Sequence, residues 1–220
     1  MPALTRDGDV FVLDLGDGEN RFHPDQVAAI NAALDEVEGA EGPKALVTAA
    51  TGKFFSTGLD LDWLGANPNE LGSYVDSVQA LLARYLVFPA PTVAALQGHN
   101  FGAGAMLALA SDFRVMRADR GFFCLPEVDL GMPFTVGMTA LVRSRLEKQT
   151  AHEAMTTGRR YGGTDAAAAR IVDAVAPEGQ VLAAALELAR PLTTKSAKAL
   201  ATIKSGIYAE VITALQQPSV

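Results

Sequence analysis

The sequence has a single cysteine, Cys124, among its 220 residues. One cysteine excludes an internal disulfide and a cysteine-rich zinc site, and it is typical of a reducing compartment. We expect Cys124 to pack rather than react. The three histidines, His23, His99 and His152, do not stand at the spacing of metal-ligand pairs. The sequence therefore predicts no metal site.

Long apolar runs and basic runs are also missing. No apolar run reaches the roughly 18 residues of a membrane span, and the N-terminal residues lack the apolar core of a signal peptide. The last residues, Pro218-Ser219-Val220, are not a Ser-Lys-Leu-type peroxisomal address. The net charge is −7, and acidic chains without a basic run bind nucleic acid poorly. We expect a cytoplasmic protein with no membrane or nucleic-acid partner, although a small anionic ligand stays possible.

The composition favours one globular domain. Hydrophobic residues make up 49% and charged residues 20% of the chain, and no Ser/Pro-rich linker divides it. Predicted strands and helices alternate, which indicates an α/β fold with a helical C-terminal region. We place the core at residues 1–190. Residues 191–220 are expected to form a C-terminal helix that packs on the core or on a neighbouring subunit.

Local patterns place the elements. Pro24 suits the first position of a helix, and Asn67 followed by Glu70 indicates a second helix that starts at Asn67. Apolar residues at helical or strand spacing mark the rest. Strands are predicted at 10–15, 45–49, 92–96, 113–116 and 121–124, and helices at 24–37, 67–88, 103–110, 135–146, 148–157, 165–171, 178–190 and, as one long helix, 194–215.

Two glycine-bearing turns follow predicted strands. They are Phe55-Ser-Thr-Gly-Leu-Asp-Leu61 and Gly98-His-Asn-Phe-Gly-Ala-Gly-Ala-Met106, and the second opens a helix. Glycine permits a positive φ and close backbone approach, and the first N–H groups of a helix have no internal acceptor. Such an end attracts an anion, either a dinucleotide pyrophosphate or the oxygen of a polarised thioester carbonyl. Taken alone, the second turn fits tight helix–strand packing equally well.

Two other enzyme classes lack their required residues. Short-chain dehydrogenases share the Gly-x-x-x-Gly-x-Gly turn, but theirs follows the first strand and is joined by Tyr-x-x-x-Lys. No lysine stands four residues after any of the four tyrosines, Tyr74, Tyr85, Tyr161 and Tyr208. A serine hydrolase is not indicated either, because the sequence has no Gly-x-Ser-x-Gly elbow.

The two turns are followed by Glu127 in Leu125-Pro-Glu-Val-Asp-Leu-Gly-Met-Pro133. Over residues 10–175 this order and spacing resemble the crotonase (enoyl-CoA hydratase/isomerase) superfamily. The resemblance implies a crotonase-type spiral of ββα units and an acyl-CoA thioester as substrate, with coenzyme A as part of that substrate and no other cofactor. It also implies a homotrimer or hexamer. The oxyanion hole would consist of the N–H groups of Leu59, after Gly58, and of Ala103, after Gly102.

The resemblance also implies a reaction. Hydratases of this family carry a second glutamate where this chain has Met106, and only Glu127 is present. One glutamate suffices to move a proton from C2 to C4 of a 3-enoyl-CoA, as in the Δ3,Δ2-enoyl-CoA isomerases of fatty-acid β-oxidation. The stretch from Phe123 to Pro133 looks especially like the plant-type peroxisomal isomerases. The alternatives are another crotonase reaction, such as hydration, and a non-catalytic acyl-CoA binder.

The remaining expected roles concern the pocket and the coenzyme A. We expect Met106, Phe101 and Phe134 to line a dry pocket that raises the pKa of Glu127. Lys53 is expected to meet a phosphate, and the backbone near Ser56 and Leu59 to meet the adenine and pantetheine.

The last expectations concern two aspartates and three lysines. Asp60 should cap the helix after the first turn, and it is also expected among the substrate-binding residues. Asp129 should face the same side as Glu127 if the segment is extended. The lysines of the C-terminal helix, Lys195, Lys198 and Lys204, either reach coenzyme A or form a solvated face.

Overall fold

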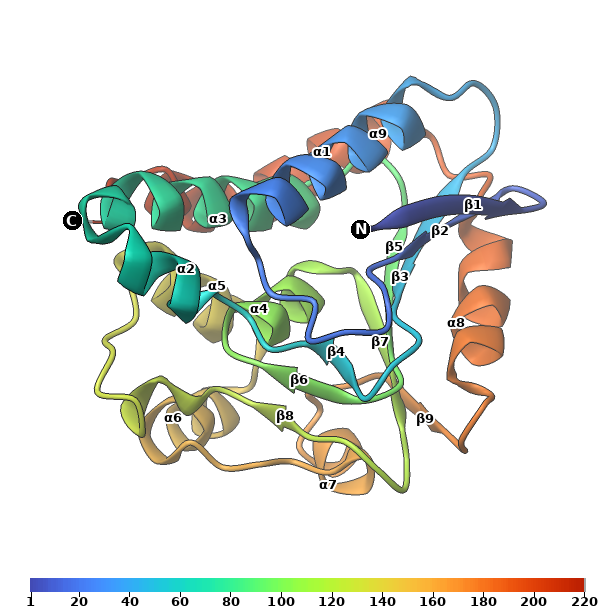
Figure 1. Ribbon diagram of the computed structural model, residues 1–220. Coiled ribbons are helices and arrows are strands. Elements are labelled where there is room, and N and C mark those ends of the chain that lie inside the picture. The colour runs from blue at the N-terminus through green and yellow to red at the C-terminus, as the bar shows by residue number, and fades with distance from the viewer. Residues whose placement is uncertain (220) are drawn as a thin grey trace.

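Two sheets organise the protein, whose computed structural model describes residues 1–219 (Figure 1). The larger sheet has the strand order β1-β2-β3-β5-β7-β9 and the smaller one the order β4-β6-β8. All paired strands run parallel except β1 and β2. The strands are β1 (Ala3–Asp7), β2 (Val10–Asp14), β3 (Ala45–Ala49), β4 (Phe54–Ser56), β5 (Thr92–Leu96), β6 (His99–Phe101), β7 (Phe113–Arg117), β8 (Phe123–Cys124) and β9 (Ala174–Ala176).

Helices cover both faces of the larger sheet (Figure 1). They are α1 (Pro24–Gly39), α2 (Leu61–Ala66), α3 (Leu71–Leu86), α4 (Ala103–Ala110), α5 (Val136–Arg145), α6 (Lys148–Thr157), α7 (Gly163–Ala168), α8 (Val181–Ala189), α9 (Ala197–Ile207) and α10 (Ala209–Leu215), with short 3₁₀ helices η1 (Pro68–Glu70), η2 (Pro126–Val128) and η3 (Arg190–Leu192). Within residues 1–219, none of these helices has both the length and the apolar content to cross a membrane.

Alternate residues of the central strands belong to two separate hydrophobic clusters, one on each face of the larger sheet. In β2, Val10 and Val12 pack with residues of α8, whereas Phe11 and Leu13 join the larger cluster that includes residues of α1, α3 and α4. A parallel sheet buried on both faces needs apolar residues at successive positions, because side chains point alternately to either face. This requirement explains the uninterrupted apolar run Val10-Phe-Val-Leu13.

The chain repeats one path through the two sheets. A strand of the larger sheet is followed by a strand of the smaller sheet and then by a helix: β3-β4-α2, β5-β6-α4 and β7-β8-η2. Strand β6 pairs in parallel with both β4 and β8. The C-terminal ends of these three strands therefore meet at one edge of the smaller sheet. This edge receives both glycine turns and the segment that carries Glu127.

Several predicted boundaries differ from the structure. Asn67 does not cap α3, because η1 intervenes and the Asn67 side chain donates instead to Trp63 O at 2.9 Å. The predicted long helix over 194–215 is wrong, since the helix ends at Ile207 and a second one starts at Ala209. Strands β1, β4, β6 and β9 were not predicted, because three of them have only three residues and β1 is largely exposed.

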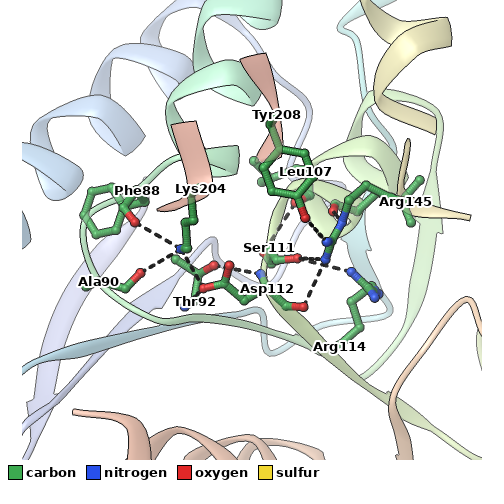
Figure 2. Close-up of polar contacts among 11 residues, drawn as sticks. Phe88, Ala90, Thr92, Leu107, Ser111, Asp112, Arg114, Arg145, Lys204 and Tyr208 are labelled. Atoms are coloured by element: carbon green, nitrogen blue, oxygen red, sulfur yellow. Dashed lines mark hydrogen bonds and ion pairs between the residues drawn. The ribbon is translucent and has the colours of Figure 1, made fainter. Parts of the chain in front are cut away.

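A buried ion pair fastens α9 to the core (Figure 2). The Lys204 ammonium lies 2.6 Å from Asp112 Oδ2 and donates to the carbonyl oxygens of Phe88 and Ala90 at 3.0 and 3.1 Å. Lys204 is 4% exposed, and burial lowers the pKa of its ammonium. The expectation that Lys204 reaches coenzyme A or solvent is therefore wrong.

Arg145 ties the same region together. Its guanidinium donates to the carbonyl oxygens of Leu109, Ser111 and Asp112 and to the hydroxyl of Tyr208, the residue between α9 and α10 (Figure 2). Helix α10 then packs against α5 and α3. The two last helices thus lie on the core of their own chain.

Lys204→Met should lower the free energy of unfolding by about 3 kcal/mol, because Asp112 would keep its partly buried charge without a cation and two carbonyls would lose a donor. Urea denaturation measures this change. Lys198→Met, which removes an exposed lysine from the same helix, is the matched control and should change stability little. Equal stability of the two variants would contradict the role given to the ion pair.

Candidate active site

The two glycine turns touch through their backbones. Gly58 has a φ of +85°, and a Cβ placed there would lie 2.8 Å from Ala103 N and 2.9 Å from Phe101 O. Any side chain would therefore push the turns apart. Ser56 holds the first turn in shape, because its hydroxyl donates to Asn20 O at 2.8 Å and accepts the Gly58 N–H at 3.0 Å.

This contact brings two unused N–H groups to one place. Gly102 turns the chain with a φ of +53°, so α4 begins at Ala103 and the Ala103 amide has no acceptor within its own helix. Among the described residues 1–219, neither the Leu59 N–H nor the Ala103 N–H donates a hydrogen bond. Both residues line the same cavity. The site thus offers two backbone donors, one of them at a helix N-terminus, to an oxygen atom bound in the cavity.

Glu127 lies on the segment that follows β8, the third of the segments that leave this edge of the smaller sheet. It lies in η2, so the expectation of an extended segment that places Asp129 on the same side is wrong. A Cβ placed on Gly102 would lie 3.4 Å from Glu127 Oε1, which locates the carboxylate beside the second turn. Its other oxygen, Oε2, is buried without a hydrogen-bond partner in the described chain. Burial raises the pKa of Glu127 to about 7.

A cavity of about 340 Å³ connects these groups. Its size is at the lower end of ligand pockets, which hold roughly 300–1,000 Å³. Met106 forms part of the wall and is itself 1% exposed. Within residues 1–219, Glu127 is the only titratable side chain that lines the cavity. The lining residues are Thr57, Leu59, Leu61, Leu71, Val75, Gly102, Ala103, Met106, Pro126, Glu127, Leu130, Gly131, Met132, Pro133, Thr135, Met138 and Ser219.

Such an arrangement can polarise a carbonyl group and move a proton beside it. Two preorganised N–H groups stabilise negative charge as it develops on the oxygen. A carboxyl group with a pKa near neutrality can accept a proton as carboxylate and return it as acid. The apolar walls favour a dry site, where these electrostatic effects are stronger than in water.

The structure gathers most of the predicted site residues. Leu59, Gly102, Ala103, Met106 and Glu127 all line the cavity, and Gly58 supports it from behind. The expectation that Phe101 and Phe134 line it is wrong. The Phe101 side chain shares one side of β6 with His99, its ring centroid 5.4 Å from the imidazole, because residues two apart in a strand point the same way. Phe134 packs against the hydrophobic core.

Three predicted ligand contacts lie outside the cavity. Ser56 is fully buried, so it supports the first turn and does not meet a ligand. Asp60 caps α2 as predicted, accepting the Trp63 N–H at 3.1 Å, while its own N–H donates to the Tyr74 hydroxyl at 2.8 Å. Lys53 is exposed, with its ammonium 5.0 Å from the centroid of the Phe54 ring. A phosphate contact of Lys53 stays a prediction.

Sequence reasoning missed the walls contributed by α3 and by the start of α5. Leu71 and Val75 of α3, and Thr135 and Met138 around the start of α5, face the cavity. Leu71 and Val75 stand at helical spacing, but that spacing predicts only a buried face. No group of three His, Cys, Asp or Glu side chains within the described part of the chain gathers as metal ligands would.

Comparison with known proteins places the chain among its relatives. The sequence profile of the enoyl-CoA hydratase/isomerase family matches residues 7–219. The peroxisomal enoyl-CoA delta isomerase 2 of Arabidopsis thaliana is 38% identical, over 96% of this chain and 93% of its own length. Enoyl-CoA delta isomerase 3 of the same plant is 35% identical, over 96% and 93%.

A solved structure agrees in fold. An apo enoyl-CoA isomerase of Mycobacterium tuberculosis superposes with a TM-score of 0.89 at 28% identity, covering 98% of this chain and 94% of that chain. The predicted α/β fold of crotonase type is thereby confirmed. With a family profile that spans nearly the whole chain and relatives that align almost end to end, this protein belongs to the enoyl-CoA hydratase/isomerase family, the crotonase superfamily.

Proposed function

We propose that the protein is an enoyl-CoA isomerase that moves a double bond from position 3 to position 2 of an enoyl-CoA. The observation that carries this proposal is the single carboxylate in the cavity. Glu127 lies beside the free amides of Leu59 and Ala103, and Met106 supplies no second acid or base. The relatives named as enoyl-CoA delta isomerases support the same reaction.

The proposed reaction uses these groups in turn. The Leu59 and Ala103 N–H groups donate to the thioester oxygen, and the Glu127 carboxylate takes a proton from C2. The electron pair of the broken C–H bond spreads over the thioester oxygen and the C2–C4 unit as a dienolate. Glu127, now a carboxylic acid, returns the proton to C4, and the double bond closes between C2 and C3. Each N–H donor is worth about 3–4 kcal/mol of transition-state stabilisation in comparable sites.

Hydration fits the cavity less well. Addition of water to a double bond needs a group that positions and activates the water while another group delivers a proton. Met106 occupies the wall with a thioether, which is a weak hydrogen-bond acceptor and no base. The apolar walls also discourage water from the reacting carbons.

The rest of the substrate and the assembly follow from the family. The cavity has room for the acyl part, so the coenzyme A would lie outside it, where Lys53 is the candidate for a phosphate contact. Involvement in fatty-acid β-oxidation and assembly as a trimer or hexamer are part of the proposal. Ile203 and Ile207, exposed on α9, offer apolar surface for such an assembly.

Glu127→Gln should lower kcat on a 3-enoyl-CoA by at least about 100-fold, because the amide cannot take the C2 proton. A spectrophotometric assay with 3-enoyl-, 2-enoyl- and 3-hydroxyacyl-CoA thioesters measures this loss and compares the reactions. Faster hydration than isomerisation by the wild type would contradict the isomerase proposal. Tight binding of all three thioesters without turnover would identify a non-catalytic binder.

Gly58→Ala should lower kcat by about 100-fold, because the added Cβ meets the Ala103 amide and separates the two donors. Gly65→Ala in α2 is the matched control, since a Cβ there meets nothing within 4 Å. Thermal unfolding of both variants separates loss of activity from loss of fold. Full activity of a folded Gly58→Ala variant would refute the oxyanion hole at this place.

The pH dependence of kcat/KM should report the raised pKa of Glu127. The reaction needs the carboxylate, so kcat/KM should fall about tenfold per pH unit below about 7 and level off above it. A steady-state series across this range, with a substrate that does not titrate there, measures the profile. If kcat/KM stayed constant on both sides of that pH, a different group would be the base.

A further inference from the structure

The segment after α10 forms one wall of the acyl cavity. Residues 217–219, here called the C-terminal strap, follow α10, and Ser219 lines the cavity. The Ser219 N–H donates to Asp76 Oδ1 at 2.8 Å, and the Ser219 hydroxyl donates to Gly72 O at 3.3 Å. Both acceptors belong to the first turns of α3. The strap is therefore held across the cavity wall by polar bonds and not by apolar packing alone.

A buried glutamine extends this connection from α3 and the strap to α5. Gln79, which is 1% exposed, donates to Gln217 O at 3.3 Å and accepts a hydrogen bond from the Thr135 hydroxyl at 2.7 Å. That hydroxyl also accepts the Met138 N–H at 3.0 Å and so caps α5. One chain of hydrogen bonds thus joins α3, α5 and the strap around the apolar space between them.

The wall has little freedom to shift. A Cβ placed on Gly137 would lie 2.6 Å from Leu215 Cα, so α5 and α10 touch through their backbones. A bulkier residue at Gly137 would force the helices apart. The position of the strap is therefore defined from two sides, by the hydrogen bonds to α3 and by the contact between α10 and α5.

The strap is bonded to a different part of the cavity wall from the segments that carry the reacting groups. Its hydrogen bonds go to Gly72, Asp76 and Gln79 of α3, whereas Leu59, Ala103 and Glu127 lie on the segments that follow β4, β6 and β8. An acyl chain whose thioester is held at Leu59 and Ala103 would extend along the apolar side chains of α3 and α5. Its free end would then approach Ser219.

We propose that the C-terminal strap is the end wall of the acyl pocket and sets the longest acyl chain that the enzyme accepts. Ser219 determines specificity at this wall, and Asp76 and Gln79 are positioning residues that act through the strap. The cavity of about 340 Å³ favours short and medium chains over long ones. This inference rests on the proposed function only in that the acyl chain occupies this cavity.

The test compares variants of Asp76 on 3-hexenoyl-, 3-decenoyl- and 3-hexadecenoyl-CoA. Asp76→Ala removes the acceptor for the Ser219 N–H, so the ratio of kcat/KM for the longest to the shortest substrate should rise by about tenfold. Asp76→Asn keeps an acceptor oxygen and should retain the wild-type ratio. Asp35→Ala, which removes an exposed carboxylate that pairs with Arg84 of α3, is the matched control and should also retain it.

A second variant works in the opposite direction. Ser219→Trp extends the wall into the cavity and should lower the ratio of long to short substrates, even if Asp76→Ala destabilises the fold. An unchanged length profile in folded Asp76→Ala and Ser219→Trp variants would overturn the inference, as would a wild type that prefers the longest substrate.

Binding separates this inference from the proposed function. Calorimetric titration with hexanoyl-, decanoyl- and hexadecanoyl-CoA gives the length preference without turnover. A wild type without isomerase activity whose length preference shifts in Asp76→Ala would refute the proposed reaction and support the strap. An active isomerase whose length preference stays the same in that variant would support the reaction and refute the strap. If the wild type bound none of these thioesters, the strap would have no acyl chain to limit, and the inference would fall.

Discussion

The close approach of Gly58 to the Ala103 amide is the contact on which the site depends. A Cβ placed on Gly58 would lie 2.8 Å from Ala103 N, so no side chain fits between the two turns. Leu59, which follows Gly58, and Ala103 both lie on the wall of one cavity. The parallel pairing of β4, β6 and β8 places the turns side by side, and the missing side chain at Gly58 lets them touch. The strand pairing thus sets where the two turns lie, and the glycine at position 58 allows their backbones to come into contact.

The second feature is the cost of burying a carboxylate. Glu127 Oε2 has no partner in the described chain, and the surrounding walls are apolar. Desolvation disfavours the charged form and brings the pKa of this carboxyl group to about 7. A partner such as a lysine would restore a low pKa and weaken the group as an acid. The same burial gives one side chain a pKa at which a carboxyl group can both accept and donate a proton near neutral pH.

The outer elements support this site from a distance. The Lys204–Asp112 pair and Arg145 fasten α9 and α10 to the core, and α10 in turn positions the C-terminal strap. These bonds join residues that are far apart in the sequence, on α9, α5 and the segment between α4 and β7. Periodicity places Lys204 on a helix but does not say which side chain it meets. The polar network was therefore out of reach of sequence reasoning, although the helices that it joins were not.

By itself, the sequence determined the order of strands and helices, the two glycine turns and the lone glutamate after them, because periodicity, glycine and charge are local properties of the chain. It also pointed to Leu59, Ala103 and Glu127 as partners, through the resemblance of their spacing to one superfamily. Only the tertiary structure decided that Phe101 and Phe134 are not part of the cavity wall, and that α3, α5 and Ser219 enclose the cavity. Which face a side chain presents depends on what packs against it, and that is settled only when distant segments meet.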